Sequence, residues 1–283
     1  MVGAARRVNR STLGSALREL RKSSGLEAKA VARGAAMSSS KLSKIENGNT
    51  APSVTDVDCI LTAIGVSNEA KAEFMAVARE AATEVTAWRL VRRLGYSRKQ
   101  QQVQALEAQT ALLRLFQPAL IPGLLQTPEY VRAVFTRESL GEVELERTIG
   151  ARLARQRVLY SREKTFRFVI TESVLRWRVL PPLMMASQLD RLISASRLPG
   201  VDIRVVALAT QQTDFPSHSF CITDDRIVVI ETAHAEIMVT DPKDVALYAH
   251  KFERFSESAL SGDAMRSLVE TIRDDFLREQ ETG

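Results

Sequence analysis

The stretch that decides the N-terminal fold is GLEAKAVARGAAMSSSKLSKIENG, which spans residues 25–48. Its apolar residues favour two short helices, at 27–33 and 38–47, separated by a tight connection at 34–37. Ser38 is a favourable N-cap for the second helix, and Gly48 is a typical residue to end it. The stretch therefore predicts a helix, a turn and a second helix.

The second of these helices has two different faces. At 100° per residue, Leu42 and Ile45 define a buried side, and the other side is short, polar and cationic. A helix that reads base edges in the major groove needs small hydrogen-bonding groups and a long cationic donor. We expect DNA contacts from Ser38, Ser39, Ser40, Lys41, Ser43, Lys44, Asn47 and Asn49. A plain solvated face is the alternative interpretation of the same pattern.

The flanking sequence completes a small helical domain. An apolar stripe from Leu13 to Leu20 predicts a first helix, which ends at Gly25. A capping box at Ser53 begins a fourth helix, and a fifth helix starts near Ser67. We expect a five-helix, all-α domain at residues 11–87, preceded by a basic flexible tail at 1–10.

Positive charge is concentrated at this end of the chain. Residues 1–50 contain ten lysines and arginines and three acidic residues, so this segment carries a net charge of +7 while the whole chain carries +5. The remaining residues are therefore slightly acidic. A phosphate-facing module requires an asymmetry of this kind.

Residues 25–48 resemble the helix-turn-helix of the XRE and phage-repressor family, with Gly-Leu, a short scaffold helix, a Ser or Thr cap and Ile-Glu-x-Gly. The resemblance implies that Glu46 pairs with Arg21 on the first helix. Two positions depart from the family pattern. Ala28 replaces a Gln that touches phosphate or base, and Ala36 occupies a turn position that often carries Gly. A recognition face of three serines and one lysine makes fewer bidentate base contacts than one built from Arg and Gln, so we expect modest intrinsic DNA affinity, compensated by dimerisation or further backbone contacts.

The rest of the chain predicts an α+β domain at 104–283, after a basic connector at 88–103. We expect helices at 106–116, 141–160, 183–197, 242–256 and 263–279. Strands are expected at 166–170, 201–208, 219–223, 226–232 and 236–240, with Asp224 and Asp225 forming a hairpin turn. The sheet is expected to be largely antiparallel, with helices packed on it.

This second half also resembles a known domain, on the strength of PGLLQTPEYVRA (122–133), RLARQ (152–156), TESVLR (171–176) and MASQLDRL (185–192). It is similar to the C-terminal domain of unknown function in XRE-type regulators of actinomycetes, a group with WhiJ-like developmental repressors and antitoxin-like regulators. The family more often shows Glu followed by Ala where Thr171–Ser173 stands. The resemblance implies regulation of transcription, often with a small acidic partner protein encoded nearby.

Six polar residues of this half are candidates for binding a partner or an effector: Gln126, Tyr130, Arg152, Arg155, Gln156 and Glu172. Arg152 and Arg155 lie three residues apart and share a helical face, which with Arg147 suits an acidic partner. The alternatives are structural. PGLLQTPEY is also consistent with a turn and an N-cap that pack a helix on the sheet. The arginines are also consistent with a solvated helix face.

Other function classes find little support in the residues. No Ser-His-Asp order, paired-carboxylate motif or phosphate-cradling glycine loop accompanies the polar groups, so we expect no enzyme activity and no cofactor. The two cysteines and three histidines lack metal-ligand spacing. No apolar run is long enough to cross a bilayer and no secretory signal is visible, so a cytoplasmic location is expected.

The hypothesis from sequence is a sequence-specific, repressor-like regulator that binds double-stranded DNA as a homodimer. Its C-terminal domain would bind a small partner protein or effector. One alternative is an antitoxin-like module that sequesters a small partner and autoregulates. Another is a small-molecule sensor, which predicts a closed apolar pocket under the sheet with a few convergent polar groups.

Overall fold

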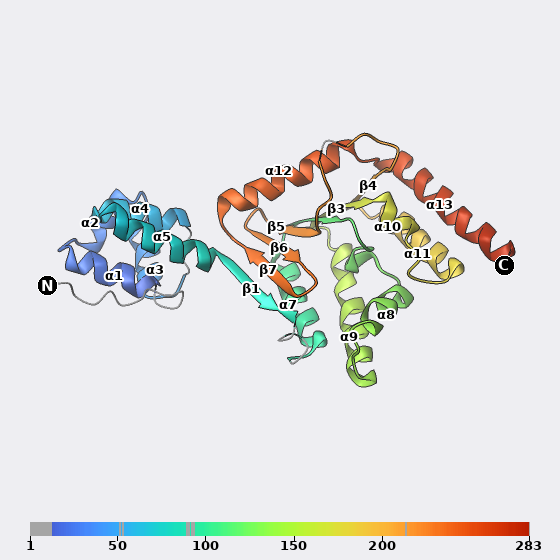
Figure 1. Cartoon of the computed structure of the whole chain (residues 1–283), viewed down its shortest axis with the longest axis horizontal. Coiled ribbons are helices and arrows are strands. Elements are labelled where there is room, and N and C mark those ends of the chain that lie inside the picture. The colour runs from blue at the N-terminus through green and yellow to red at the C-terminus, as the bar shows by residue number, and fades with distance from the viewer. Residues whose placement is uncertain are drawn as a thin grey trace. The chain divides into compact units, whose positions relative to one another are not determined.

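The structure is a computed structural model, and it describes residues 13–50, 52, 54–88, 91, 94–212 and 214–282. The described residues form two compact units (Figure 1). Unit 1 contains the described residues up to Glu84 together with Met238–Asp244, and unit 2 contains Val85–Ile237 and the residues from Val245 onward. The tail expected at 1–10 and the capping residue expected at Ser53 lie outside the described residues.

Unit 1 contains five helices around one apolar core, as predicted. They are α1 (Leu13–Ser23), α2 (Ala28–Gly34), α3 (Ser39–Glu46), α4 (Val54–Ile64) and α5 (Asn68–Ala82). Leu17 of α1, Leu42 of α3 and Leu61 of α4 are each fully buried in this core. Removal of these side chains from water is the main term that stabilises so small a domain.

Two backbone features fix how α3 is held. Gly14 lies so close to α3 that a Cβ there would meet the carbonyl oxygen of Ile45 at 2.2 Å, so only glycine permits this approach. Ala36, in the turn before α3, adopts a φ of +52°. The left-handed region is unfavourable for a residue with a Cβ, which explains why the family often has glycine at this position.

Unit 2 contains most of a seven-stranded mixed sheet with the order β1-β7-β6-β5-β2-β3-β4. The strands are β1 (Thr83–Ala87), β2 (Leu112–Gln117), β3 (Thr165–Thr171), β4 (Val201–Val206), β5 (Phe220–Thr223), β6 (Ile227–Glu231) and β7 (Ala235–Val239). β5 is antiparallel to both β2 and β6, whereas β2, β3 and β4 run parallel. Asp224 and Asp225 both have positive φ in the β5–β6 turn, where the hairpin was predicted. The α+β prediction is confirmed.

Three local expectations for this part of the chain are wrong. Residues 112–117 form β2 rather than the end of a helix, because LLRLFQ is a buried central strand, and a short apolar run does not reveal its period. Residues 83–87, expected within the helical domain, form β1 of the sheet. Residues 96–103, expected in the connector, begin helix α7 (Tyr96–Gln109), where Tyr96 and Gln100 are buried.

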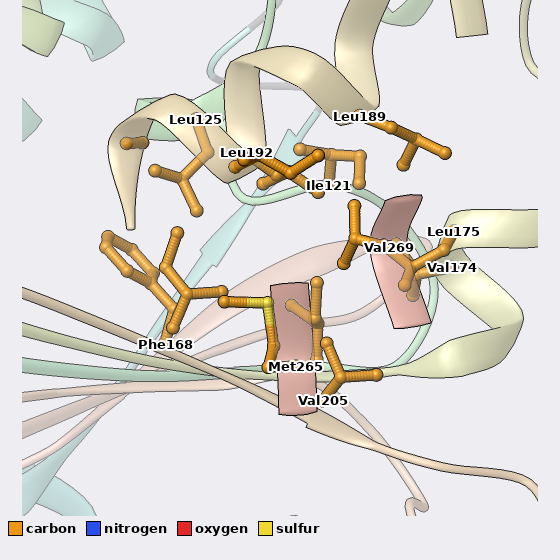
Figure 2. Close-up of a cluster of buried hydrophobic side chains, with 14 of the residues drawn as sticks. Ile121, Leu125, Phe168, Val174, Leu175, Leu189, Leu192, Val205, Met265 and Val269 are labelled. Carbon is orange, nitrogen blue, oxygen red and sulfur yellow. The ribbon is translucent and has the colours of Figure 1, made fainter. Parts of the chain in front are cut away.

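Helices cover both faces of the sheet. The remaining helices are α8 (Pro128–Thr136), α9 (Glu142–Arg155), α10 (Glu172–Arg176), α11 (Pro182–Ala195), α12 (Pro242–Ser258) and α13 (Gly262–Thr282), with 3-10 turns at Gly123–Leu125 and Gln156–Tyr160. The largest core joins one face of the sheet to α11 and α13, with Phe168, Leu192 and Met265 at its centre (Figure 2). Burial of these side chains supplies most of the stability of unit 2.

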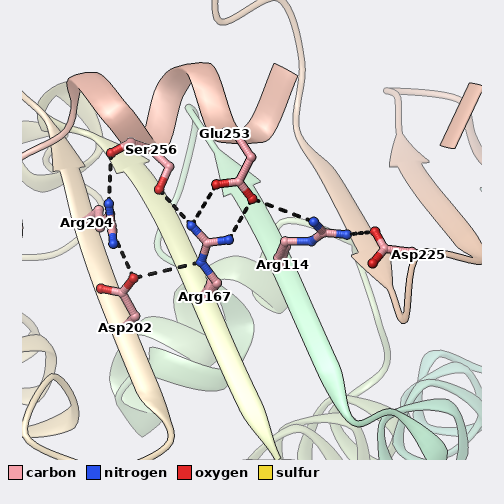
Figure 3. Close-up of polar contacts among 7 residues, drawn as sticks. All are labelled: Arg114, Arg167, Asp202, Arg204, Asp225, Glu253 and Ser256. Carbon is pink, nitrogen blue, oxygen red and sulfur yellow. Dashed lines mark hydrogen bonds and ion pairs between the residues drawn. The ribbon is translucent and has the colours of Figure 1, made fainter. Parts of the chain in front are cut away.

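The opposite face of the sheet is joined to α12 by apolar and ionic contacts. Phe116 of β2 stacks on Phe255 with the ring centroids 4.2 Å apart. Arg167 of β3 donates to both carboxylate oxygens of Glu253, at 2.6 and 2.9 Å, and to the hydroxyl of Ser256 (Figure 3). Arg204 of β4 donates to the carbonyl of Ser256. These arginines therefore hold α12 in place across neighbouring strands.

Candidate functional site

The outer face of α3 is polar, cationic and accessible within unit 1. Leu42 and Ile45 are fully buried and anchor the inner side of the helix. The residues that the sequence places on or beside the outer side are all exposed: Ser38, Ser39, Ser40, Lys41, Ser43, Lys44, Asn47 and Asn49. The helix therefore has the amphipathic division that groove recognition requires.

Two of these residues contribute to the geometry of the helix as well. The hydroxyl of Ser38 accepts a hydrogen bond from the backbone N–H of Lys41 at 3.1 Å and caps the helix. The backbone N–H of Asn49 donates to the carbonyl of Lys44 at 2.8 Å after the chain turns through Gly48. Both ends of α3 are thus satisfied by hydrogen bonds, which holds its outer side chains on a regular helix.

The cations of this face differ in their surroundings. The ammonium of Lys41 lies 2.7 Å from a carboxylate oxygen of Asp56 on α4. Asn47 bridges two neighbours, since its amide donates to Ser43 and its oxygen accepts from Arg18. Among the described residues, no carboxylate lies within ion-pair distance of Lys44. Lys44 is therefore the α3 side chain whose charge is most available to a polyanion.

A buried ion pair fixes the end of α3 to α1. Arg21 Nε and Nη2 donate to the two carboxylate oxygens of Glu46 at 2.7 and 2.8 Å, and Nη1 donates to the carbonyl of Leu26 at 3.0 Å. Arg21 is 9% exposed and Glu46 is 6% exposed. The hydrogen bond to Glu46 raises the pKa of Arg21 above its ordinary value. This is the contact that the family resemblance implies.

In unit 2, the PGLLQTPEY loop is held together by its own polar side chains. Gln126 and Tyr130 are fully buried. The Gln126 amide donates to the carbonyl of Ile121 at 2.7 Å, and the Tyr130 hydroxyl accepts from the N–H of Ile121 at 3.3 Å. Gln156 donates to the carbonyl of Gln126 at 2.7 Å. The expectation that Gln126 and Tyr130 offer contacts to a partner is wrong, because their polar atoms satisfy the buried loop backbone.

A third glutamine in this arrangement was missed from the sequence. Gln188 of α11 is fully buried, accepts from the N–H of Thr127 at 2.8 Å and donates to the carbonyl of Leu125 at 2.9 Å. A usable sign was present, because Gln188 stands in the apolar stripe formed by Met185 and Leu192. A polar residue at such a position needs a buried partner.

Glu172 also serves the fold rather than a partner. It is 7% exposed, and its carboxylate accepts hydrogen bonds from Arg176 at 2.7 Å and from the N–H of Leu208 at 2.9 Å. Both oxygens are thus engaged within unit 2. The expected contact of Glu172 with a partner is wrong in this structure, because the carboxylate is turned inward.

The arginine face predicted on α9 is turned inward as well. Arg155 is 8% exposed and forms a bidentate pair with Glu107 of α7, at 3.0 and 2.5 Å. Its remaining nitrogen donates to Gln100. Only Arg147 of the proposed basic face is exposed. The expectation of an exposed basic face is therefore wrong for Arg155, because α7 supplies a buried carboxylate that local sequence does not reveal.

Arg152 faces α7 and the PGLLQTPEY loop without a carboxylate partner. Its Nε donates to Gln100 at 2.7 Å, and Nη1 donates to the side-chain oxygen of Gln126 at 3.3 Å. The guanidinium lies 4.8 Å from the ring centroid of Phe135. A Cβ on Gly123 would meet Nη1 of Arg152 at 2.3 Å, so a larger residue there would displace the guanidinium. Burial, followed by the nearby charge of Arg155, lowers the pKa of Arg152 to about 9.

Arg152 and Arg155 line a pocket of about 360 Å³ that lies wholly within unit 2. The pocket walls come from α7, α8, α9 and the segment that follows β6. A small-molecule sensor was expected to have an apolar pocket with a few convergent polar groups; this pocket has an apolar wall together with several charged groups. It is the feature of unit 2 that brings together two of the residues predicted for effector binding.

No helix in the part of the chain that the structure describes is long and apolar enough to cross a membrane. No group of three or more His, Cys, Asp or Glu side chains within it is arranged to hold a metal ion. The thiol of Cys221 has its pKa raised to about 12 by burial, so it remains protonated at neutral pH.

The fold and the α3 surface define a helix-turn-helix protein with a larger α+β domain. Residues 12–74 match the model of a helix-turn-helix domain. Residues 100–271 match the domain of unknown function DUF5753. Because this second match covers more than half of the chain, the protein belongs to the DUF5753 family.

Other comparisons are distant. No curated protein matches the sequence. TrmBL2, described as an archaeal chromatin protein with a novel mode of DNA binding, is 17% identical over 69% of this chain and 60% of its own, with a TM-score of 0.35. Nuc, a phospholipase D family member from Salmonella typhimurium, is 12% identical over 64% of this chain and 98% of its own, with a TM-score of 0.35. NucT from Helicobacter pylori is 10% identical over the same shares, with a TM-score of 0.37. Scores this low establish no shared fold.

Proposed function

We propose that the protein is a sequence-specific DNA-binding regulator of transcription, repressor-like and dimeric, in which α3 enters the major groove. The observation that carries the proposal is the division of α3 into a fully buried apolar side and an exposed side of serines, asparagine and unpaired lysine. Such side chains donate to and accept from base edges, and Lys44 adds a long cationic donor. The helix-turn-helix match over residues 12–74 supports the same assignment.

The eight exposed residues of this face have two roles in the proposal. Those in the middle of the outer side, Ser40, Ser43 and Lys44, face the bases. Those at its margins contact phosphates, which position the helix without specifying sequence. The helical domain that ends with α5 at Ala82 forms the DNA-binding part, and unit 2 binds an effector or a small acidic protein and has no catalytic role. The protein acts in the cytoplasm, on the nucleoid.

Selection of bound sequences from random double-stranded DNA, at a stated salt concentration, tests this proposal. A dimer with two-fold symmetry predicts an inverted repeat whose half-sites lie about one helical turn, or 34 Å, apart. Enrichment of no motif would contradict sequence-specific binding. Enrichment of a single, unrepeated half-site would contradict the dimer and leave the role of α3 standing.

The antitoxin-like alternative makes a different prediction. A protein whose main task is to sequester a small partner should co-purify with that partner in stoichiometric amount. Stoichiometric co-purification would favour sequestration, and loss of the partner without a change in DNA affinity would exclude regulation through it. The alternative of a small-molecule sensor is favoured by a specific observation, the charged pocket of unit 2.

A further inference from the structure

The pocket of unit 2 has the size of a small-ligand site. Its volume of about 360 Å³ lies near the lower end of the range for ligand pockets, which is about 300 to 1,000 Å³. Apolar and aromatic side chains form much of its wall: Trp88, Tyr96, Val103, Leu120, Val134 and Phe135. The space therefore suits a small molecule with an apolar body.

The cations that line the pocket are not equivalent. Lys99 is neutralised by Glu236, with the ammonium 2.5 Å from a carboxylate oxygen. Arg155 is neutralised by Glu107. Arg152 contacts only amide oxygens and the face of Phe135, and no ion pair within the described residues includes it. The Arg152 guanidinium thus faces the pocket without a direct ion pair among the described residues, although Glu231 and Glu107 lie near enough to favour its charged form.

Two carboxylates also line the pocket: Glu138, which accepts a hydrogen bond from the Tyr96 hydroxyl at 2.6 Å, and Glu231, which has no direct ion pair among the described residues. Glu231, at the end of β6, lines the pocket and remains solvent-accessible. Strand alternation places it on the same face of the sheet as Val229, which pairs with Cys221 of β5. The pocket walls partly desolvate the exposed Glu231 carboxyl group and raise its pKa, and the charges of Arg152, Lys99 and Arg155 oppose this rise. No ion pair within the described residues joins Glu231 to Arg152 or to another cation.

We propose that this pocket binds a small zwitterion, an α-amino acid with an apolar or aromatic side chain. The carboxylate of the ligand pairs with Arg152, its ammonium pairs with Glu231, and its side chain packs against the aromatic and aliphatic wall. Each charge of the ligand then forms a direct pair with a side chain that no ion pair among the described residues engages. The proposal rests on the proposed regulatory function, in which it names the class of effector.

The chemistry of the pocket disfavours a phosphate or another simple anion. Such a ligand would meet one unpaired guanidinium and be repelled by Glu231 in the same small space. It would also lack an ammonium to compensate Glu231, whose desolvation would then increase. A ligand with only a cationic amine would be repelled by Arg152 and would lack a carboxylate to pair with it. A ligand that carries both charges avoids both costs.

Thermal unfolding of the full chain without DNA, in the presence of each proteinogenic L-amino acid at about 10 mM, tests the proposal by mass action. We expect one or more apolar or aromatic amino acids to raise Tm by several degrees. Analogues without the carboxylate, such as 2-phenylethylamine, and without the amine, such as 3-phenylpropionate, should bind more weakly than phenylalanine. Absence of stabilisation by every amino acid would overturn the proposal.

Two variants test where the ligand lies. Calorimetric titration of Glu231→Gln and Arg152→Met with the stabilising amino acid should give a Kd increased about tenfold or more, because each variant removes one charge-assisted contact. Glu129→Gln and Arg162→Met change exposed residues outside the pocket and should leave Kd unchanged. If Arg152→Met fails to fold, Glu231→Gln alone carries the test. An unchanged Kd in Glu231→Gln would place binding elsewhere and overturn the proposal.

The DNA experiment is read separately from ligand binding. An enriched operator together with no amino-acid binding would overturn the ligand proposal and leave the regulator proposal intact. Amino-acid binding together with no enriched operator would overturn the regulator proposal and leave the ligand proposal intact. A ligand that binds the pocket but leaves the operator Kd unchanged would contradict its role as an effector.

Discussion

Helices α3 and α9 are each held by one buried bidentate ion pair, yet their other cations face opposite environments. Arg21 and Glu46 fix α3 to α1, and Lys44, which has no ion pair within the described part of the chain, is exposed. Glu107 and Arg155 fix α9 to α7, and Arg152, which likewise has no ion pair there, lines a pocket. The comparison indicates that a second helix packed over a cationic side chain changes its surroundings. Lys44 is open to solvent, whereas Arg152 of α9 is covered by α7 and faces an enclosed space.

The largest expected effect is on the α9 anchor. Glu107→Gln leaves the Arg155 guanidinium buried without a counter-charge, and loss of one partner of a buried pair costs about 3–5 kcal/mol. We expect the free energy of unfolding, measured by denaturant titration, to fall by this amount. Glu129→Gln, which changes an exposed carboxylate on α8, should alter it by less than about 0.5 kcal/mol. Equal effects of the two variants would show that α9 is not anchored by this pair.

The α3 anchor should behave in the same way but with a smaller loss. Glu46→Gln removes the charge that faces Arg21, while the hydrogen bond from Arg21 to the carbonyl of Leu26 remains. We expect a loss of about 3 kcal/mol. Glu19→Gln, on the exposed side of α1, provides the matched control. A loss confined to DNA affinity, with unchanged stability, would mean that the pair does not support the helix.

The turn before α3 offers a stabilising change. Ala36 has a φ of +52°, and the left-handed conformation costs a non-glycine residue about 1–2 kcal/mol. Ala36→Gly removes this strain at some cost in unfolded-chain entropy, so we expect a net stabilisation of about 0.5–1 kcal/mol. Ala30→Gly, at an exposed position within α2, should instead destabilise by about 1 kcal/mol. The same sign for both variants would contradict the role of the turn.

A smaller, pH-dependent effect is expected on the sheet face covered by α12. Hydrogen bonds from Arg167 lower the pKa of Glu253. A carboxyl group with a lowered pKa in the folded state stabilises the protein above its unfolded pKa of about 4.3, and this contribution is lost as the pH falls through the folded value.

Glu253→Gln should therefore flatten the acid limb of the stability profile, by less than about 1 kcal/mol because the carboxylate is partly exposed. Denaturant titrations between neutral and acidic pH would measure this difference. Glu257→Gln, on the same helix but exposed, is the control. An acid limb with the same slope in wild type and Glu253→Gln would exclude this contribution.

How well the sequence predicted these regions depends on how far apart in the sequence the contacting residues lie. The apolar and polar faces of α3 were predictable because Leu42, Ile45 and the capping Ser38 lie within ten residues of one another. The inward direction of Arg155 was not predictable, because Glu107 is 48 residues away and belongs to a helix whose end was misplaced. Residues 112–116 were predicted as the end of a helix because so short and mostly apolar a run carries no reliable period.

The candidate sites divide in the same way. All eight predicted residues of the α3 face are exposed, whereas Gln126, Tyr130 and Glu172 are buried and bonded within unit 2. A polar residue in a specific motif can serve either a ligand or a buried backbone, and sequence alone does not separate the two. Glu231 was missed because only the sheet brings it near Arg152, which lies in another part of the chain.

The most direct test of the central claim is the affinity of Lys44→Ala for the selected operator and for random DNA, measured by fluorescence anisotropy at one salt concentration. The claim predicts unchanged stability and an operator Kd raised about tenfold to a hundredfold, since a specific base contact contributes about 1–3 kcal/mol. The Kd for random DNA should rise much less, and the charge-matched Arg162→Ala should leave both unchanged. An equal loss on both DNAs would reduce Lys44 to a phosphate contact, and no loss on either would contradict recognition through α3.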